Sequence, residues 1–76
     1  MDKKYYLTSA IKREKDGFVS FCPELDIASQ GDTVEEAAYN LKEAVGLFLE
    51  CAEDGEIKRR LPDEIYITHF EASYAT

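Results

Sequence analysis

Residues 31–37 read GDTVEEA, and this stretch decides the fold because a strand must end and a helix must begin within it. Thr33 precedes Glu36 by three positions, the spacing of a capping box. The Thr33 hydroxyl can accept from the Glu36 amide, and the Glu36 carboxylate can reach back to the Thr33 amide. Gly31 ends the strand where a side chain would clash. The stretch lacks the second glycine and the lysine of a phosphate loop, so it predicts a structural joint.

Apolar residues after this joint recur in steps of three and four, which indicates a long helix with one apolar stripe. The stripe comprises Val34, Ala37, Ala38, Leu41, Ala44, Val45, Phe48, Leu49 and Ala52. Gly55 is expected to cap the C-terminus of this helix. Pro62 is expected to keep residues 58–61 out of any helix.

Segments rich in β-branched and aromatic residues precede the helix and predict strands. The expected strands are residues 4–14, 18–22 and 25–30. Residues 15–17 are expected to form the first hairpin turn, in which Gly17 can accept a positive φ, and Pro23 is expected to end or kink the second strand. A last strand, residues 64–70, would return parallel to the first by a right-handed crossover. The predicted fold class is α+β, in the order β-β-β-α-β, an antiparallel meander with one helix packed on a small sheet.

A single helix covers one face of such a sheet, yet the strands carry apolar side chains on both faces. Val19 and Phe21 oppose Phe18 and Cys22 across the second strand. Aromatic side chains tolerate half-exposure on small sheets, which is one explanation. The other is that the uncovered face or an edge strand is buried against another copy or a different protein. The second explanation is favoured and predicts a homo-oligomer.

The chain has 76 residues, with 16 acidic against 9 basic side chains and a formal net charge of -7. A single domain, 1–76, is expected, without linker or repeat. The negative charge repels phosphate backbones and suits a basic protein partner, so no direct nucleic-acid binding is expected. No segment approaches the roughly 18 consecutive apolar residues of a membrane span, and the N-terminal residues lack a secretory apolar run. A soluble cytoplasmic protein is expected.

The sequence has few side chains suited to catalysis or metal binding. Cys22 and Cys51 have neither a CxxC spacing nor a zinc-site histidine, so both are expected to be free thiols in buried or half-buried positions. His69 is the only histidine. The aspartates fall in expected turns or helix ends, and the glutamates crowd an exposed helix face, so no pair is held for acid–base or two-metal catalysis. We expect no enzyme, no cofactor and no metal.

Two stretches, DGFVSFCPELD and SQGDTVEEAAYNLKEAV, and a proline before the last expected strand resemble the HicB antitoxins of type II toxin–antitoxin systems. The matching positions are Gly17, Pro23, Glu24, Leu25, residues 29–33, Glu36, Ala37, Asn40 and Ala44. The resemblance implies a partial RNase H-like fold that lacks the metal-binding acidic set. It also implies self-association and a HicA toxin as partner, a small basic ribonuclease with a double-stranded-RNA-binding-domain-like fold.

The function implied is an antitoxin that binds and inactivates a HicA-type mRNA interferase. Clustered carboxylates in two regions are the expected partner interface, namely Glu24, Asp26, Asp32, Glu35 and Glu36. Many HicB antitoxins carry an operator-binding segment after the core. Here residues 71–76 alone follow the last expected strand, so no C-terminal DNA-binding domain is expected. Two alternatives are an orphan oligomeric binding or regulatory domain without a toxin and a minimal RNase H-like nuclease.

Overall fold

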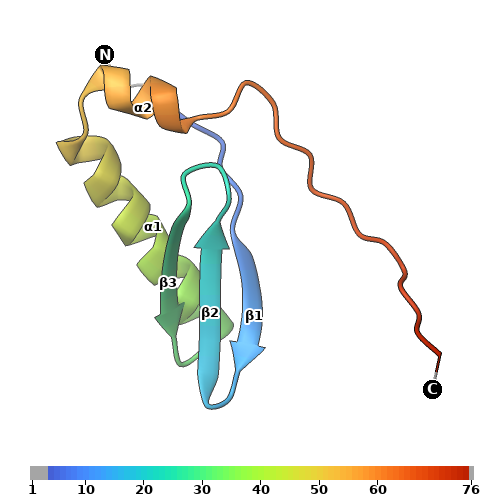
Figure 1. The fold of residues 1–76 in the computed structure, drawn as a ribbon. Helices are drawn as coiled ribbons and strands as arrows, with labels where there is room; N and C mark the ends of the chain where they lie inside the picture. Colours follow the sequence, from blue (N-terminus) through green and yellow to red (C-terminus); the bar gives the residue numbers. More distant parts are fainter. Residues whose placement is uncertain (1–3, 76) are drawn as a thin grey trace.

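The structure is a computed structural model that describes residues 4–75. Three strands form an antiparallel sheet in the order β1-β2-β3, and two helices follow them in the chain (Figure 1). The elements are β1 (Ala10–Glu14), β2 (Gly17–Cys22), β3 (Ile27–Gly31), α1 (Val34–Cys51) and α2 (Asp54–Arg60). The α1 helix covers one face of the sheet, and α2 lies at the end where β3 begins. The α+β class and the meander-then-helix order are therefore confirmed.

The core lies between α1 and the sheet. Its buried side chains are Cys22, Leu25, Leu41 and Val45, with Leu7, Ile27, Phe48, Leu49 and Leu61 packed around them. Ser20 is the buried polar residue on this face, and its hydroxyl donates to the carbonyl of Ala37 at 2.8 Å. A buried hydroxyl without a partner would destabilise the fold, so this bond fixes how α1 sits on β2.

The joint at residues 31–37 forms as predicted. The Thr33 hydroxyl accepts from the Glu36 amide at 3.0 Å, and Thr33 is the N-cap of α1. The Glu36 carboxylate reaches the amide of Asp32 at 2.8 Å, one residue before the amide that the sequence predicts. A Cβ on Gly31 would lie 2.5 Å from the backbone nitrogen of Ala37, so the chain passes the helix here only without a side chain.

The strands are shorter than predicted or shifted. β1 begins at Ala10, whereas residues 4–9 carry no strand. Residues 23–26 form a turn in which Asp26 has a φ of 57°, so β3 begins only at Ile27. Leu25 points into the core from that turn and is 1% exposed. Its burial explains why an apolar residue lies outside the strand.

Gly17 has a different role from the one predicted. It is the first residue of β2, and the positive φ in the preceding turn, 38°, belongs to Lys15. A Cβ on Gly17 would lie 2.8 Å from the carbonyl oxygen of Gly31. The glycine therefore allows a close approach of two backbones and does not supply the positive φ of the turn.

The prediction for the residues after α1 is also wrong. α1 ends at Cys51 with Ala52 as its C-cap, and Gly55 lies inside a second helix, α2. Pro62 restricts only the residue before it, and Leu61 is extended with φ -75° and ψ 126°. α2 therefore continues to Arg60. Its acidic first turn and basic last turn complement the helix dipole, which explains why this short segment is helical.

The last predicted strand, residues 64–70, does not form within this chain. Residues 62–75 carry neither helix nor strand and project from the body as an extended arm, here called the C-terminal arm (Figure 1). The alternation in the sequence is local and favours an extended backbone, but a strand also requires a neighbour to supply the ladder of hydrogen bonds. The predicted right-handed crossover to a last strand beside the first strand is therefore wrong for the single chain.

Candidate functional site

A group of carboxylates gathers at one end of the sheet, the lower end in Figure 1. They come from the turn between β1 and β2 and from the joint between β3 and α1. The residues of this acidic end are Glu14, Asp16, Asp32, Glu35 and Glu36. All five side chains are exposed and face solvent.

The strand register brings these two segments together. Glu14 pairs with Gly17, and Phe18 pairs with Gly31, so the first turn lies beside the joint. A hollow of about 580 Å³ opens between them, and four of the five carboxylates line it, together with Asn40. The Nζ of Lys12 lies 3.0 Å from the Oε2 of Glu14, but this exposed ion pair is weak. The acidic end can therefore attract a positively charged surface.

The predicted interface is divided by the structure. Asp32, Glu35 and Glu36 belong to the acidic end, whereas Glu24 and Asp26 lie in the turn before β3. The five residues of β3 separate the two groups, a length of about 17 Å.

Sequence reasoning missed Glu14 and Asp16 as members of the acidic end. The hairpin register was the signal that could have found them, because a meander places the first turn beside the end of the third strand.

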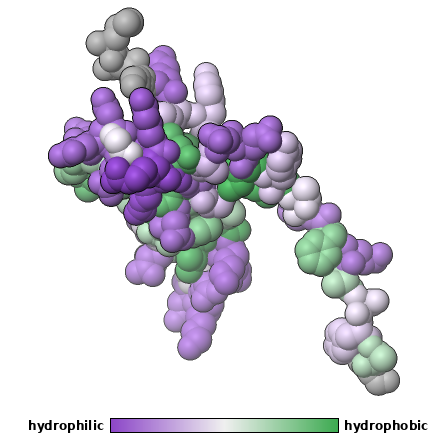
Figure 2. Space-filling model, turned by 45° about the horizontal axis from the view of Figure 1, so that its top comes forward, coloured by the Kyte–Doolittle hydropathy of each residue, from purple (hydrophilic) through white to green (hydrophobic). Residues whose placement is uncertain are grey.

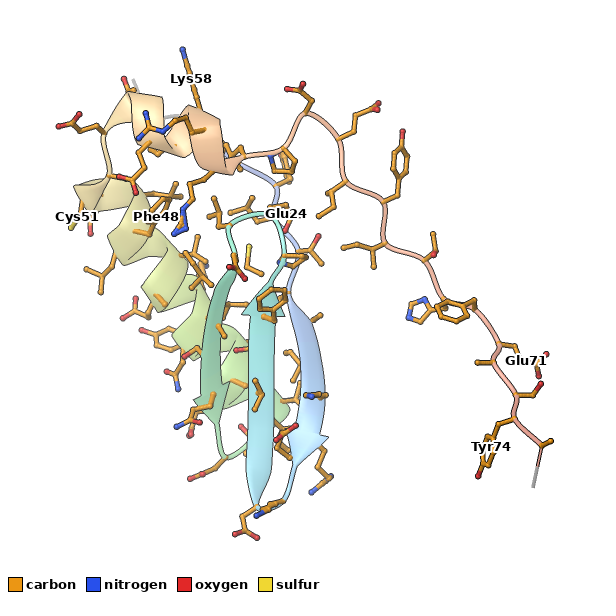
Figure 3. All side chains as sticks on the ribbon, in the orientation of Figure 1. Glu24, Phe48, Cys51, Lys58, Glu71 and Tyr74 are labelled. Carbon is orange, nitrogen blue, oxygen red and sulfur yellow. The ribbon has the colours of Figure 1, made fainter. Side chains whose placement is uncertain are left out.

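Glu24 serves as a clamp within the fold. One of its carboxylate oxygens accepts from the Thr8 hydroxyl at 2.6 Å, and both accept from the Thr8 amide at 3.0 Å. Partial burial alone would raise the pKa of Glu24, but the hydrogen bonds donated by Thr8 outweigh it and lower the pKa. Glu24 lies at the turn between β2 and β3, near α2 (Figure 3). This carboxylate is occupied by the fold, while Asp26 is exposed.

The two cysteines are free thiols, as predicted, but they lie in different environments. Cys22 is buried, and its Sγ donates to the Oε1 of Glu24 at 3.5 Å. Burial raises the pKa of Cys22, so its thiol stays protonated and unreactive. Cys51 is exposed, which contradicts the expected burial. His69 lies exposed on the C-terminal arm.

The last turn of α2 carries three consecutive basic residues, 58–60, and Arg60 is the one that contacts both α1 and the turn before β3. The guanidinium of Arg60 donates to the carbonyl of Leu25 at 3.1 Å and lies 4.8 Å from the ring centroid of Phe48. Arg60 thus ties α2 to the turn that holds Glu24. Lys58 and Arg59 are exposed in the last turn, where they complement the helix dipole.

Residues 4–75, the part of the chain that the structure describes, contain neither a metal-binding cluster nor a membrane-spanning helix. No three side chains of the types that bind metals gather closely enough to hold an ion. Neither helix combines the length and the apolar composition of a bilayer crossing.

Comparison with known proteins identifies two similar proteins from one organism. It is 41% identical over 63 residues to the UPF0150 protein ssl0738 of Synechocystis sp., a match that covers 80% of this chain and 86% of the relative. It is 46% identical over 48 residues to the UPF0150 protein ssr1765 of the same organism, covering 60% of this chain and 61% of that protein. No family model matches the sequence, and no solved structure matches it. The extent and identity of the first match show that the chain belongs to the UPF0150 family.

Proposed function

We propose that this protein is a HicB-like antitoxin that binds and inactivates a small basic ribonuclease of the HicA type. The acidic end is the observation that carries the proposal, because five exposed carboxylates gather there and four of them line one hollow. The net charge of -7 and the sequence resemblance support the same function. The partial RNase H-like arrangement of the sheet and helix is part of this proposal.

The mechanism proposed is occlusion. A ribonuclease that binds RNA presents cationic side chains to the phosphate groups of its substrate. Asp16 and Glu35 at the acidic end would bind those cationic side chains in place of the RNA phosphate groups. Long-range attraction would accelerate the encounter, and the apolar surface buried in the complex would set its lifetime. The antitoxin would contribute no catalytic step of its own.

The structure refines which predicted contacts to test. Asp32, Glu35 and Glu36 remain in the proposed interface, and Glu14 and Asp16 join them. Glu24 is removed from it because its carboxylate already accepts hydrogen bonds from Thr8. Asp26 is exposed but lies at the opposite end of β3, so it is not part of this surface.

The test is co-expression with a small basic reading frame adjacent in the genome, followed by pull-down and RNA-cleavage assays. Asp16→Lys combined with Glu35→Lys should slow association at least about tenfold, since steering acts mainly on the association rate. The same variant should restore RNA cleavage. Neither substitution removes a side-chain partner of the capping box formed by Thr33 and Glu36.

The matched control is Glu50→Lys combined with Glu53→Lys. It makes the same change in net charge near the other end of α1, and both residues are exposed. The control should bind nearly as fast as the unmodified protein. Equal slowing in the two variants would show that only total charge matters and would reject the acidic end as the contact surface. If no basic ribonuclease from the same genome binds, the antitoxin function itself is rejected.

A further inference from the structure

The C-terminal arm has the side-chain pattern of a strand that is buried on both faces. Ile65 and Ile67 alternate with Tyr66 and Thr68, and Phe70 continues the second set. In an extended backbone, these two sets point to opposite sides. All are exposed in the single chain, Tyr66 by 79% and Phe70 by 86%. Figure 2 shows the arm standing clear of the body with apolar (green) side chains along it.

The sheet has an edge that fits such a strand. Within residues 4–75, β1 pairs with β2 alone, so its outer side carries backbone groups free for a further ladder. The opposite edge is less accessible, because Asn40 on α1 donates to the carbonyl of Gln30 in β3 at 2.8 Å. The carboxylates of Asp32 and Glu36 also lie beside that edge and would repel an acidic strand.

Apolar hollows lie at this edge on both faces of the sheet, one beside residues 5–9, which lead into β1, and one beside β1 itself. On the helix side, a hollow of about 450 Å³ is lined by Leu7, Leu41, Val45 and Leu49, among others. On the open side, one of about 410 Å³ is lined by Ala10, Ile11, Lys12, Val19, Phe21 and Ala28. A strand added at this edge would therefore find apolar surface for both of its sets of side chains.

The charges of the two segments are complementary. Residues 4–13 contain Lys4, Lys12 and Arg13 and no acidic residue, whereas residues 63–71 contain Asp63, Glu64 and Glu71 and no lysine or arginine. Lys4 and Lys12 are eight positions apart, as are Asp63 and Glu71. A strand that aligns residues 63–71 with residues 4–12, in either direction, therefore places an acidic residue beside a basic one at both ends of the pairing.

The hinge directs the arm away from its own sheet. Leu61 packs on the core, and its amide donates to the carbonyl of Ile57 at 3.0 Å. Pro62 keeps Leu61 extended, and the chain departs from the body at this point (Figure 1). A short, fixed hinge of this kind favours exchange of the following segment between copies over closure on the same chain.

We propose that residues 64–70 of one copy add as a strand to the sheet edge of a second copy, alongside residues 5–11, which lead into β1 and include its first two residues, and that the two copies exchange their arms reciprocally. The exchanged strand supplies the neighbour that the last predicted strand lacks within one chain. The interface would bury Ile65, Ile67 and Phe70 against these two hollows.

Light scattering and hydrogen exchange on the full chain test this proposal. The unmodified protein should be a dimer at micromolar concentration, and amides 64–70 should exchange at least about tenfold more slowly in the dimer than after dilution to monomer. Ile65→Asp combined with Ile67→Asp should be monomeric, with the far-UV circular dichroism and thermal transition of the diluted unmodified protein. Tyr74→Asp is the control, because it places a charge on the arm beyond the paired segment and should remain dimeric.

Three other results of these measurements would contradict the exchange of arms, and each indicates a different arrangement. Protection of amides 64–70 in a monomer would show that the arm pairs with β1 of its own chain. A dimer in which those amides exchange freely would show that the copies meet through another surface, such as the open sheet face. A protein that stays monomeric with an unprotected arm at high micromolar concentration would have no exchanged strand. Each of these results overturns the proposal.

Discussion

The clamp between Glu24 and Thr8 gives the sharpest test of how this fold is held together, and the substitution is Glu24→Gln. The carboxylate has two oxygens, and these accept from the amide and the hydroxyl of Thr8 at 2.6–3.0 Å. Glutamine has one oxygen and an NH₂ group, so one Thr8 donor would face another donor. The clamp anchors the segment that carries Leu7 onto the core. Its loss should therefore lower the free energy of unfolding rather than produce only a local change.

The magnitude follows from the type of hydrogen bond. Bonds to charged groups contribute about 1.5–3 kcal/mol when buried, and this site is only partly buried. A loss of about 1–2 kcal/mol at neutral pH is expected, which for a domain of this size lowers Tm by about 4–16 °C.

The pH dependence provides an independent check on Glu24. Its pKa is lowered in the folded state, so the carboxylate stabilises the fold above the ordinary pKa of 4.5. That contribution is lost as the pH falls through the lower, folded-state pKa. The difference in stability between the unmodified protein and Glu24→Gln should therefore be full at pH 7 and should shrink as the pH falls below 4.5.

Thermal and urea unfolding at a series of pH values measure this effect, with Asp26→Asn as the matched control. Asp26 lies in the same turn, is exposed and has a φ of 57°, a conformation that asparagine also adopts readily. The control makes the same charge change and should alter stability by less than about 0.5 kcal/mol. Equal losses in the two variants, or a difference for Glu24→Gln that does not shrink in acid, would refute the clamp.

Two further predictions concern the joint at residues 31–37. Thr33→Ala should lower the free energy of unfolding by about 0.5–2 kcal/mol, because the cap on the Glu36 amide is lost; full stability with lost partner binding would instead make Thr33 a contact residue. Gly31→Ala should destabilise by at least about 2 kcal/mol in urea unfolding, because the new Cβ would lie 2.5 Å from a backbone nitrogen that cannot rotate away. Gly46→Ala is its control, since no atom lies within 4 Å of a Cβ there, and that change should be neutral or stabilising.

Local patterns in the sequence were sufficient to predict the joint and the long helix. The capping box at Thr33 depends on residues within one helical turn, and the apolar stripe that includes Leu41 and Val45 depends on a single period. The burial of Leu41 and Val45 confirms the direction of that stripe. The meander was predicted for the same reason, because short turns join antiparallel neighbours.

The errors arose where two distant segments decide the outcome. Glu24 was read as a free carboxylate because nothing near it in the sequence indicates Thr8, which lies 16 residues away. α2 was missed because Gly55 and Pro62 were treated as helix breakers, whereas Arg60 binds the Leu25 carbonyl 35 residues away and holds this helix in place. The acidic end was assigned only in part because its membership depends on the register of the first hairpin.

The two proposed surfaces, the acidic end and the β1 edge, are compatible in one assembly. The basic residues Lys12 and Arg13 lie on β1 beside the turn that contributes Asp16 to the acidic end. Arg13 lies over the ring of Phe18, 4.7 Å from its centroid, so its charge is held near that turn. Addition of the arm would bring Asp63 or Glu71 of the second copy to these two basic side chains and offset their charge. Exchange of arms would thereby make each acidic end more negative, while it covers the apolar edge and leaves the hollow at the acidic end open to a basic partner.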